Sequence, residues 1–227
     1  MINNVKTFAS ILMPGVQHMR HTHLPEHKFV KGQPNTGVEM AEDLERIAMN
    51  FGGENIAACI VEPIAGSTGT LVPPKGYLKR IREICDKHGI LLIFDEVITG
   101  WGRTGSAFAS QEFGVTPDMI TMAKATTNGV IPMGVVAVKE EMYDAVLDSS
   151  KNPEGTPELF HGYTYSGIPA AVAAGLAVQD IFDKEDIFNR AKEMSPYFQD
   201  GLHSLKDLKE IVSIRGYGMM GGIEMRM

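Results

Sequence analysis

Three features are scarce or missing in this chain: cysteine, basic clusters and long apolar runs. The only cysteines among the 227 residues are Cys59 and Cys85, which make no disulfide framework and lie in apolar patterns typical of reduced core residues. Acidic residues outnumber basic ones by 28 to 21, and the two signs are interleaved, which argues against a nucleic-acid partner. No apolar stretch reaches the roughly 18 residues of a membrane span. The patch 8–13 is too short for a signal peptide. We therefore predict a cytoplasmic protein.

The chain also lacks the loop that its most conspicuous acidic motif would need in an ATPase. Asp95 and Glu96 follow the apolar run 90–94, as the acidic residues of a nucleotide-hydrolysing strand do. That function requires a G-x-x-x-x-G-K-[ST] loop. Neither Gly-Lys-Ser nor Gly-Lys-Thr occurs here. An ATPase is therefore nearly excluded, whereas a strand-end aspartate that caps the next loop remains an alternative interpretation of Asp95.

Four histidines near the amino terminus form the one cluster that could suggest a metal. They are His18, His21, His23 and His27. Apart from Glu26, no cysteine or acidic residue accompanies them at ligand spacing. We therefore expect a solvated or packed loop and no metal site.

What the chain does contain is an alternation of apolar strands and amphipathic helices. Strands are expected at 56–61, 90–95, 119–123 and 135–138, and helices at 39–50, 77–88, 107–113, 169–182 and 187–205. This alternation predicts an α/β fold with a mostly parallel sheet flanked by helices, whose strands are buried on both faces. Residues 1–38 look irregular. Short strands at 211–214 and 219–225 suggest a second, smaller unit.

Two polar residues stand at the ends of expected strands. Asp95 ends the run 90–94, and Lys124 ends the run 119–123 and precedes a Gly/Pro loop at 128–134. Open α/β sheets bind ligands at the carboxyl ends of their strands. Pyridoxal phosphate (PLP) uses a lysine amine to form a Schiff base and an acidic residue at its pyridine nitrogen. The pair therefore suggests a PLP site.

Each of these residues also has an ordinary structural interpretation. Lys124 could be a solvated strand-end lysine, but the apolar run before it favours partial burial, which would lower its pKa and free the amine as a nucleophile. Thr164 precedes the helix that begins at Pro169, where a hydroxyl suits a phosphate. An ordinary helix cap is the alternative for Thr164.

Several segments in order resemble class III PLP-dependent aminotransferases. They are 61–67 (VEPIAGS), 76–78 (GYL), 92–105 (LIFDEVITGWGRTG), 117–118 (PD) leading to 123–124 (AK), and 161–166 (HGYTYS). The ordered series is far more specific than any one segment. Within the class, the chain is most similar to the ω-amino acid (β-alanine):pyruvate branch.

The resemblance implies a role for each candidate residue. Lys124 would be the Schiff-base lysine, Asp95 would pair with the pyridine nitrogen, and Val97 would pack on the ring. Thr164 would bind the phosphate of the neighbouring subunit's site in a homodimer, and Glu62 would have a supporting role. The implied fold is PLP fold-type I, with residues 1–180 forming part of the large PLP-binding domain and 181–227 starting the small carboxyl-terminal domain.

The implied reaction moves an amino group from an ω-amino acid or amine to a keto acid such as pyruvate. Ser67 stands where relatives that act on ornithine or γ-aminobutyrate commonly carry glutamate, which argues against those substrates. Family members are roughly twice as long, so we expect an internal fragment that binds PLP weakly alone. The alternatives are a non-catalytic remnant or subunit, or a class III relative such as an aminomutase or decarboxylase.

Overall fold

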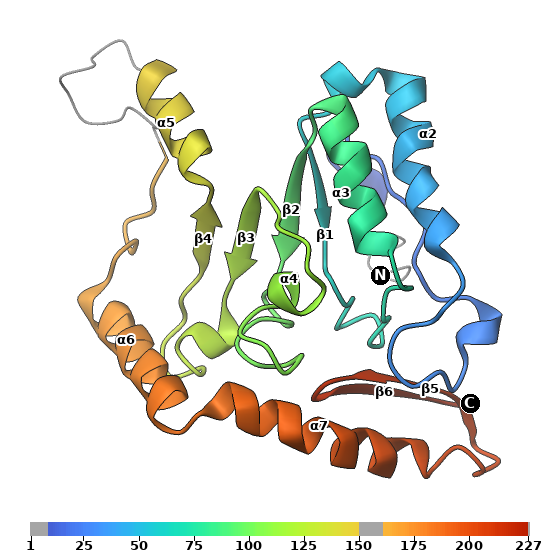
Figure 1. Cartoon of the computed structure of the whole chain (residues 1–227). Coiled ribbons are helices and arrows are strands. Elements are labelled where there is room, and N and C mark those ends of the chain that lie inside the picture. Colours follow the sequence, from blue (N-terminus) through green and yellow to red (C-terminus); the bar gives the residue numbers. More distant parts are fainter. Residues whose placement is uncertain (1–8, 150–160, 227) are drawn as a thin grey trace.

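The computed structural model describes residues 9–149 and 161–226, and a four-stranded sheet lies at its centre (Figure 1). Its strands, in spatial order, are β1 (Ala58–Val61), β2 (Leu91–Asp95), β3 (Met119–Met122) and β4 (Val135–Val138). β1, β2 and β3 are parallel, and β4 is antiparallel to β3. The predicted mostly parallel α/β sheet is therefore confirmed. β4 reverses because a short 3₁₀ turn and a loop, not a crossover helix, connect it to β3.

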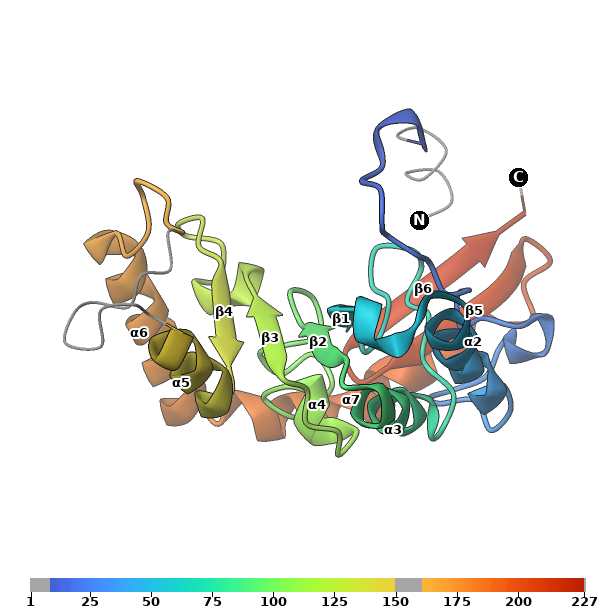
Figure 2. The same cartoon turned by 90° about the horizontal axis from the view of Figure 1, so that it is seen from above.

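One face of this sheet is covered by α2 (Glu42–Phe51) and α3 (Tyr77–His88), which lie side by side in Figures 1 and 2. Helix α3 has the predicted bounds. Gly89 ends it in the left-handed conformation, with φ at +68°, and donates its N–H to the carbonyl of Cys85. The side chains of this layer form one core: Met40, Ala41, Leu44, Ala48, Cys59, Tyr77, Leu78, Ile81, Ile84, Cys85, Ile90, Leu92, Phe94 and Val115.

The opposite face of the sheet is less covered than expected. Strand pairing places Ile60, Ile93, Met119 and Val138 side by side on it. Ile60 is 59% exposed and Val138 is 46% exposed, while Ile93 and Met119 are half-buried. The expectation that the strands are buried on both faces is therefore wrong for the described residues, because the helices of the core lie on one side only.

Three helices follow the sheet: α5 (Glu140–Ser149), α6 (Pro169–Lys184) and α7 (Ile187–His203). α5 was not predicted. α6 lies beyond β4, and α7 runs below the carboxyl ends of the parallel strands β1, β2 and β3 in Figure 1. A Cβ at Gly175 of α6 would lie 3.5 Å from the carbonyl oxygen of Thr126, so the predicted close packing of this helix on another backbone is confirmed at that position.

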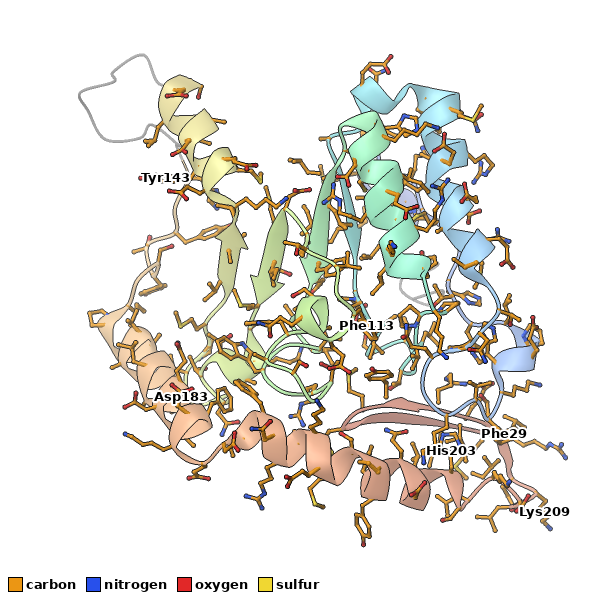
Figure 3. All side chains as sticks on the ribbon, in the orientation of Figure 1. Phe29, Phe113, Tyr143, Asp183, His203 and Lys209 are labelled. Carbon is orange, nitrogen blue, oxygen red and sulfur yellow. The ribbon has the colours of Figure 1, made fainter. Side chains whose placement is uncertain are left out.

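A separate two-stranded sheet ends the chain, formed by β5 (Ile211–Tyr217) and β6 (Met220–Met225). It packs on loops at the carboxyl ends of the main strands. Met219 donates its N–H to the carbonyl of Arg103 at 2.8 Å. Phe113, labelled in Figure 3, lies next to Tyr217 with ring centroids 5.2 Å apart. The small sheet thereby closes the carboxyl edge beside β1 and β2.

No helix in ranges 9–149 and 161–226 combines the length and apolar character that a membrane crossing requires. In the histidine-rich loop, His27 is buried, and its ring contacts the N–H of Leu24 and the hydroxyl of Thr36. The loop is therefore packed against the protein at this residue. No group of three or more potential metal ligands occurs in the same ranges.

Candidate active site

Asp95 ends β2 at the carboxyl edge of the sheet. Its backbone pairs with Thr121 of β3, and its side chain is half-buried. The Oδ1 atom accepts a hydrogen bond from the N–H of Val97 at 3.1 Å. The other carboxylate oxygen accepts no hydrogen bond from the described residues. Asp95 therefore has one oxygen that fixes the side chain and one that can receive a ligand proton.

The next residue, Glu96, is fully buried and has a structural role that sequence reasoning missed. Its carboxylate accepts hydrogen bonds from the backbone N–H groups of Ala109 at 2.6 Å and Ser110 at 2.8 Å, and from the hydroxyl of Thr99 at 3.1 Å. Burial raises the pKa of Glu96, against the opposing effect of these three donors. Glu96 thereby ties the loop after β2 to the short helix α4 (Ala109–Glu112).

Lys124 follows β3 and begins a 3₁₀ turn that ends at Thr126. Its backbone is left-handed, with φ at +49°, which is uncommon for a residue with a side chain. The side chain is exposed and forms no hydrogen bond or ion pair within the described ranges. The predicted partial burial of this amine is therefore not found, because the strand ends at Met122 and Lys124 belongs to a surface turn.

The residues predicted around this pair lie on the same edge of the sheet. Glu62 follows β1, is half-buried, and accepts the N–H of Gly66 at 2.8 Å through Oε2, which holds the loop after β1. Val97 is half-buried and adjacent to the Asp95 carboxylate through its N–H. Parallel strands place their carboxyl ends together, so Glu62, Asp95 and Lys124 follow three neighbouring strands at one edge.

Thr164 does not lie at the strand ends that carry Glu62, Asp95 and Lys124. It is exposed, in the segment that precedes α6 beyond β4 in Figure 1. The alternative that it caps this helix is wrong, because the residue at the helix cap is Ile168. The neighbouring Tyr163 and Tyr165 are 76% and 79% exposed. This turn is thus a protruding surface with large aromatic side chains.

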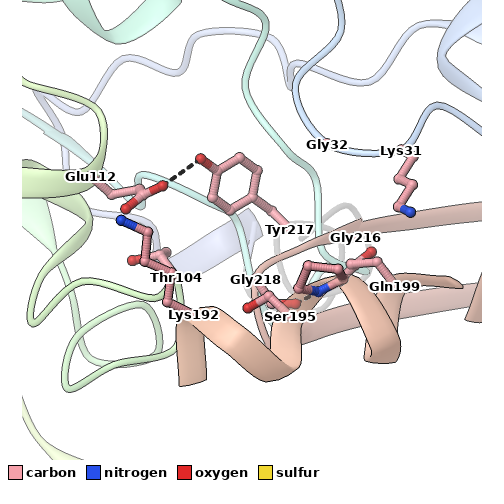
Figure 4. Close-up of a pocket in the computed structure, with 11 residues that line it drawn as sticks. Lys31, Gly32, Thr104, Glu112, Lys192, Ser195, Gln199, Gly216, Tyr217 and Gly218 are labelled. Atoms are coloured by element: carbon pink, nitrogen blue, oxygen red, sulfur yellow. Dashed lines mark hydrogen bonds between the residues drawn. The ribbon is translucent and has the colours of Figure 1, made fainter. Parts of the chain in front are cut away.

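A pocket of about 470 Å³ lies between α7 and the β5–β6 hairpin (Figure 4). Lys192 and Gln199 of α7 and Tyr217 of β5 are among its lining residues. The hydroxyl of Tyr217 donates to Glu112 Oε1 at 2.7 Å. None of the predicted site residues lines this pocket. The pocket is therefore separate from the candidate site at the strand ends.

The groups at the strand ends fit the donor set that PLP requires. A carboxylate with an oxygen that accepts no hydrogen bond from residues 9–149 and 161–226 suits a protonated pyridine nitrogen, and a primary amine that contacts no partner in those ranges suits an aldehyde. Asp95 provides the first and Lys124 the second. Asp95 ends β2 and Lys124 lies in the turn just after the neighbouring parallel strand β3, so a ligand at this edge could reach both.

Comparison with known proteins identifies the family of the chain. Residues 3–227 match the family model described as Aminotransferase class-III. The chain is 54% identical to the omega-aminotransferase of Caulobacter vibrioides over 97% of its length and 50% of the relative's. It is 46% identical to the beta-alanine–pyruvate aminotransferase of Pseudomonas aeruginosa, over 97% of this chain and 49% of that protein. The chain thus spans about half the length of these curated relatives.

Solved structures give the same result for the fold. The (S)-enantioselective omega-transaminase of Thermomicrobium roseum is 38% identical with a TM-score of 0.76, over 83% of this chain and 41% of that one. An amine transaminase from an uncultivated Pseudomonas species, solved in the PLP-bound form, is 39% identical with a TM-score of 0.77, over 82% and 42%. The α/β fold, the ordered motifs and these relatives lead to one conclusion: the chain belongs to the class III aminotransferases.

Proposed function

We propose that this chain provides the cofactor-binding part of a PLP-dependent transaminase that moves an amino group from an ω-amino acid or amine to a keto acid such as pyruvate. The observation that carries the proposal is the position of Asp95 and Lys124 at the carboxyl ends of adjacent parallel strands, each with a polar atom that has no partner in the part of the chain that the structure describes. The names of the two curated relatives described above support the substrate class.

Each residue has a defined task in this proposal. When bound, PLP supplies an aldehyde that takes up amino groups and a ring that withdraws electrons. The Lys124 amine would hold the cofactor and, once free, carry a proton at Nζ. The free oxygen of Asp95 would keep the ring nitrogen protonated. Val97 would pack on the ring, and Glu62 would hold the loop after β1 in place.

The remaining expectations concern assembly. We propose a homodimer in which Thr164 binds the phosphate of the partner subunit's site, because Thr164 and its two tyrosine neighbours are exposed on one turn. We further propose that residues 1–180 belong to the large domain and that 181–227 start the small one. The β5–β6 hairpin, which forms its own sheet, supports that division. A cytoplasmic location fits this function.

The exposure of Lys124 favours weak cofactor binding by the 227-residue chain alone. A desolvated lysine is more nucleophilic at neutral pH than an exposed one, because burial favours the neutral amine. This observation supports the alternative of a non-catalytic remnant or subunit. An aminomutase or decarboxylase of the same class would use the same Asp95 and Lys124. These two residues therefore do not distinguish the reaction types, and an activity assay is needed to do so.

The test is covalent mapping of the cofactor site. The chain is mixed with PLP, reduced with borohydride, digested, and analysed by mass spectrometry. We expect label on Lys124, loss of that label in Lys124→Ala, and no change in the matched control Lys79→Ala, which removes an exposed lysine of α3. Label spread evenly over surface lysines would contradict the proposed site.

Amino transfer is then measured with β-alanine as donor and pyruvate as acceptor, and alanine is quantified. Alanine formation that requires Lys124 supports the transaminase. Label on Lys124 without alanine formation would leave the site in place and assign the chain to the remnant or subunit alternative.

A further inference from the structure

One hydrogen-bonded connection joins the loop that follows Asp95 to the turn that contains Lys124. The indole Nε1 of Trp101, in the loop after β2, donates to the hydroxyl of Thr126 at 3.0 Å. Thr126 in turn donates its hydroxyl hydrogen to the carbonyl of Ala123 at 3.0 Å. Ala123 directly precedes Lys124, so the connection ends at the peptide bond that joins these two residues.

The turn that receives this connection needs support. Lys124 has a left-handed backbone, which for a residue with a Cβ costs roughly 1–2 kcal/mol. The backbone N–H of Gly129 donates to the carbonyl of Lys124 at 3.2 Å, and that of Thr126 donates to Ala123 at 3.0 Å. Thr126 is only 4% exposed, so its hydroxyl depends on protein partners for its hydrogen bonds.

Trp101 is held in place by contacts that do not involve its indole N–H. Its ring stacks on Phe182 of α6, with centroids 5.8 Å apart and an interplanar angle of 23°, and packs on Phe108 at 5.1 Å. Its backbone N–H donates to the carbonyl of Ala107. A phenylalanine at this position would keep an aromatic ring between Phe108 and Phe182 but would remove the N–H donor together with part of the indole volume.

We propose that Trp101 is a positioning residue that, through Thr126, holds the backbone turn from which the Lys124 side chain extends. This inference rests on the proposed function, because it concerns the geometry with which the Lys124 amine meets a cofactor aldehyde. Asp95 ends β2, and Trp101 lies in the loop that follows, whose base is anchored by buried Glu96. Thus a shift of the loop after β2 would be passed to the Lys124 turn through one hydrogen bond.

The variants Trp101→Phe, Thr126→Val and their combination test the connection. The matched control is Thr127→Val, which removes a buried hydroxyl next to the same turn. The Thr127 hydroxyl donates to the carbonyl of Ile131 and has no part in the Trp101–Thr126–Ala123 connection. Two rates are measured at Lys124 by peptide mapping: reductive labelling with PLP, which is faster where a held cofactor meets an oriented amine, and reductive methylation with formaldehyde, which depends on accessibility alone.

We expect Trp101→Phe and Thr126→Val each to slow PLP labelling of Lys124 by about three- to tenfold, the effect of losing one hydrogen bond. The combined variant should be no slower than the slower single variant, because both remove the same connection. Formaldehyde methylation of Lys124 should be unchanged, as should PLP labelling in Thr127→Val. Multiplied effects in the combined variant, or an equal loss of formaldehyde reactivity, would overturn the inference.

Amide hydrogen exchange keeps the two proposals distinguishable. Faster exchange at Thr126 and Gly129 in Trp101→Phe and in Thr126→Val, without faster exchange in α3, supports the connection even if the unaltered chain shows no PLP label on Lys124. Absence of that label would reject the proposed cofactor site but would not bear on the connection between Trp101 and the Lys124 turn. Unchanged exchange at both amides would overturn the positioning role whatever the labelling result.

Discussion

Asp95 lies directly opposite Thr121 in the parallel pairing of β2 with β3. Lys124 is therefore separated from the residue beside Asp95 by only two residues of chain. In a parallel sheet the two carboxyl ends face the same side, so a carboxylate and an amine from distant parts of the sequence reach one edge. This register, together with family membership, is the basis of the proposed cofactor site.

The free oxygen of Asp95 predicts the effect of removing its charge. Asp95→Asn keeps an amide oxygen for the N–H of Val97 but cannot favour a protonated ring nitrogen. We expect PLP binding to weaken by about tenfold or more, as the loss of a charge-assisted hydrogen bond of roughly 1.5–3 kcal/mol implies. Equilibrium dialysis against PLP measures this. Asp144→Asn, an exposed change in α5, is the control, and equal affinity in both variants would contradict the role of Asp95.

Glu96 predicts a stability effect rather than a binding effect. Glu96→Ala would leave three donors without a partner: two backbone N–H groups and the hydroxyl of Thr99. We expect the free energy of unfolding to fall by about 3 kcal/mol or more, since hydrogen bonds to charged groups contribute roughly 1.5–3 kcal/mol each and are not additive. Glu96→Gln should lose less because its amide oxygen can still accept. Urea unfolding measures both, and equal stability of the two variants would refute this assignment.

Asp118 predicts acid sensitivity at the opposite end of the sheet. Burial acts to raise its pKa, but hydrogen bonds from Lys139, the N–H of Leu92 and Arg82 outweigh it and hold the pKa at about 2. The unfolded value is about 3.9. Because the folded pKa is the lower one, the stabilisation is complete above pH ~4 and is lost as pH falls toward 2.

The variant Asp118→Asn isolates this contribution. The difference in unfolding free energy between the unaltered chain and the variant should be largest above pH ~4 and should shrink between pH ~4 and ~2. Chemical denaturation at several pH values gives the difference directly. A difference that stays constant over this range would show that the carboxylate charge of Asp118 is not the stabilising feature.

The docking of the small sheet predicts a steric effect at one glycine. A Cβ at Gly222 of β6 would lie 2.6 Å from the carbonyl oxygen of Gly69, which belongs to the backbone and cannot yield easily. Arg215 holds the same carbonyl through Nε at 2.8 Å. Gly222→Ala should therefore destabilise the chain by about 1–3 kcal/mol, as overpacking does.

Gly201 offers a matched control for this prediction. It lies within α7, and a Cβ there would meet no heavy atom within 4 Å. Gly201→Ala should be neutral or stabilising by up to about 1 kcal/mol, because alanine favours the helix. Thermal unfolding compares the two variants, and similar melting temperatures would mean that the hairpin does not dock on the Gly69 loop.

Local patterns sufficed for much of the fold. α3 begins at Tyr77 and ends at His88 as predicted, because its apolar spacing and the glycine after it are properties of neighbouring residues. Asp95 and Lys124 were found for the same reason: each directly follows an apolar run. The direction of β4 could not be predicted from the sequence, because a strand's apolar pattern is the same in either direction. Helix α5 was not predicted at all.

The sequence by itself determined which residues could do chemistry and at which strand ends they stand, since residue type and short-range periodicity are written in the chain. Only the tertiary structure decided their surroundings. It showed that Glu96 anchors a loop, that Lys124 lies exposed on a left-handed turn, and that Trp101 reaches Thr126 from another strand's loop. These features depend on contacts between segments far apart in the sequence, and no local pattern encodes which distant group a buried donor or acceptor will meet.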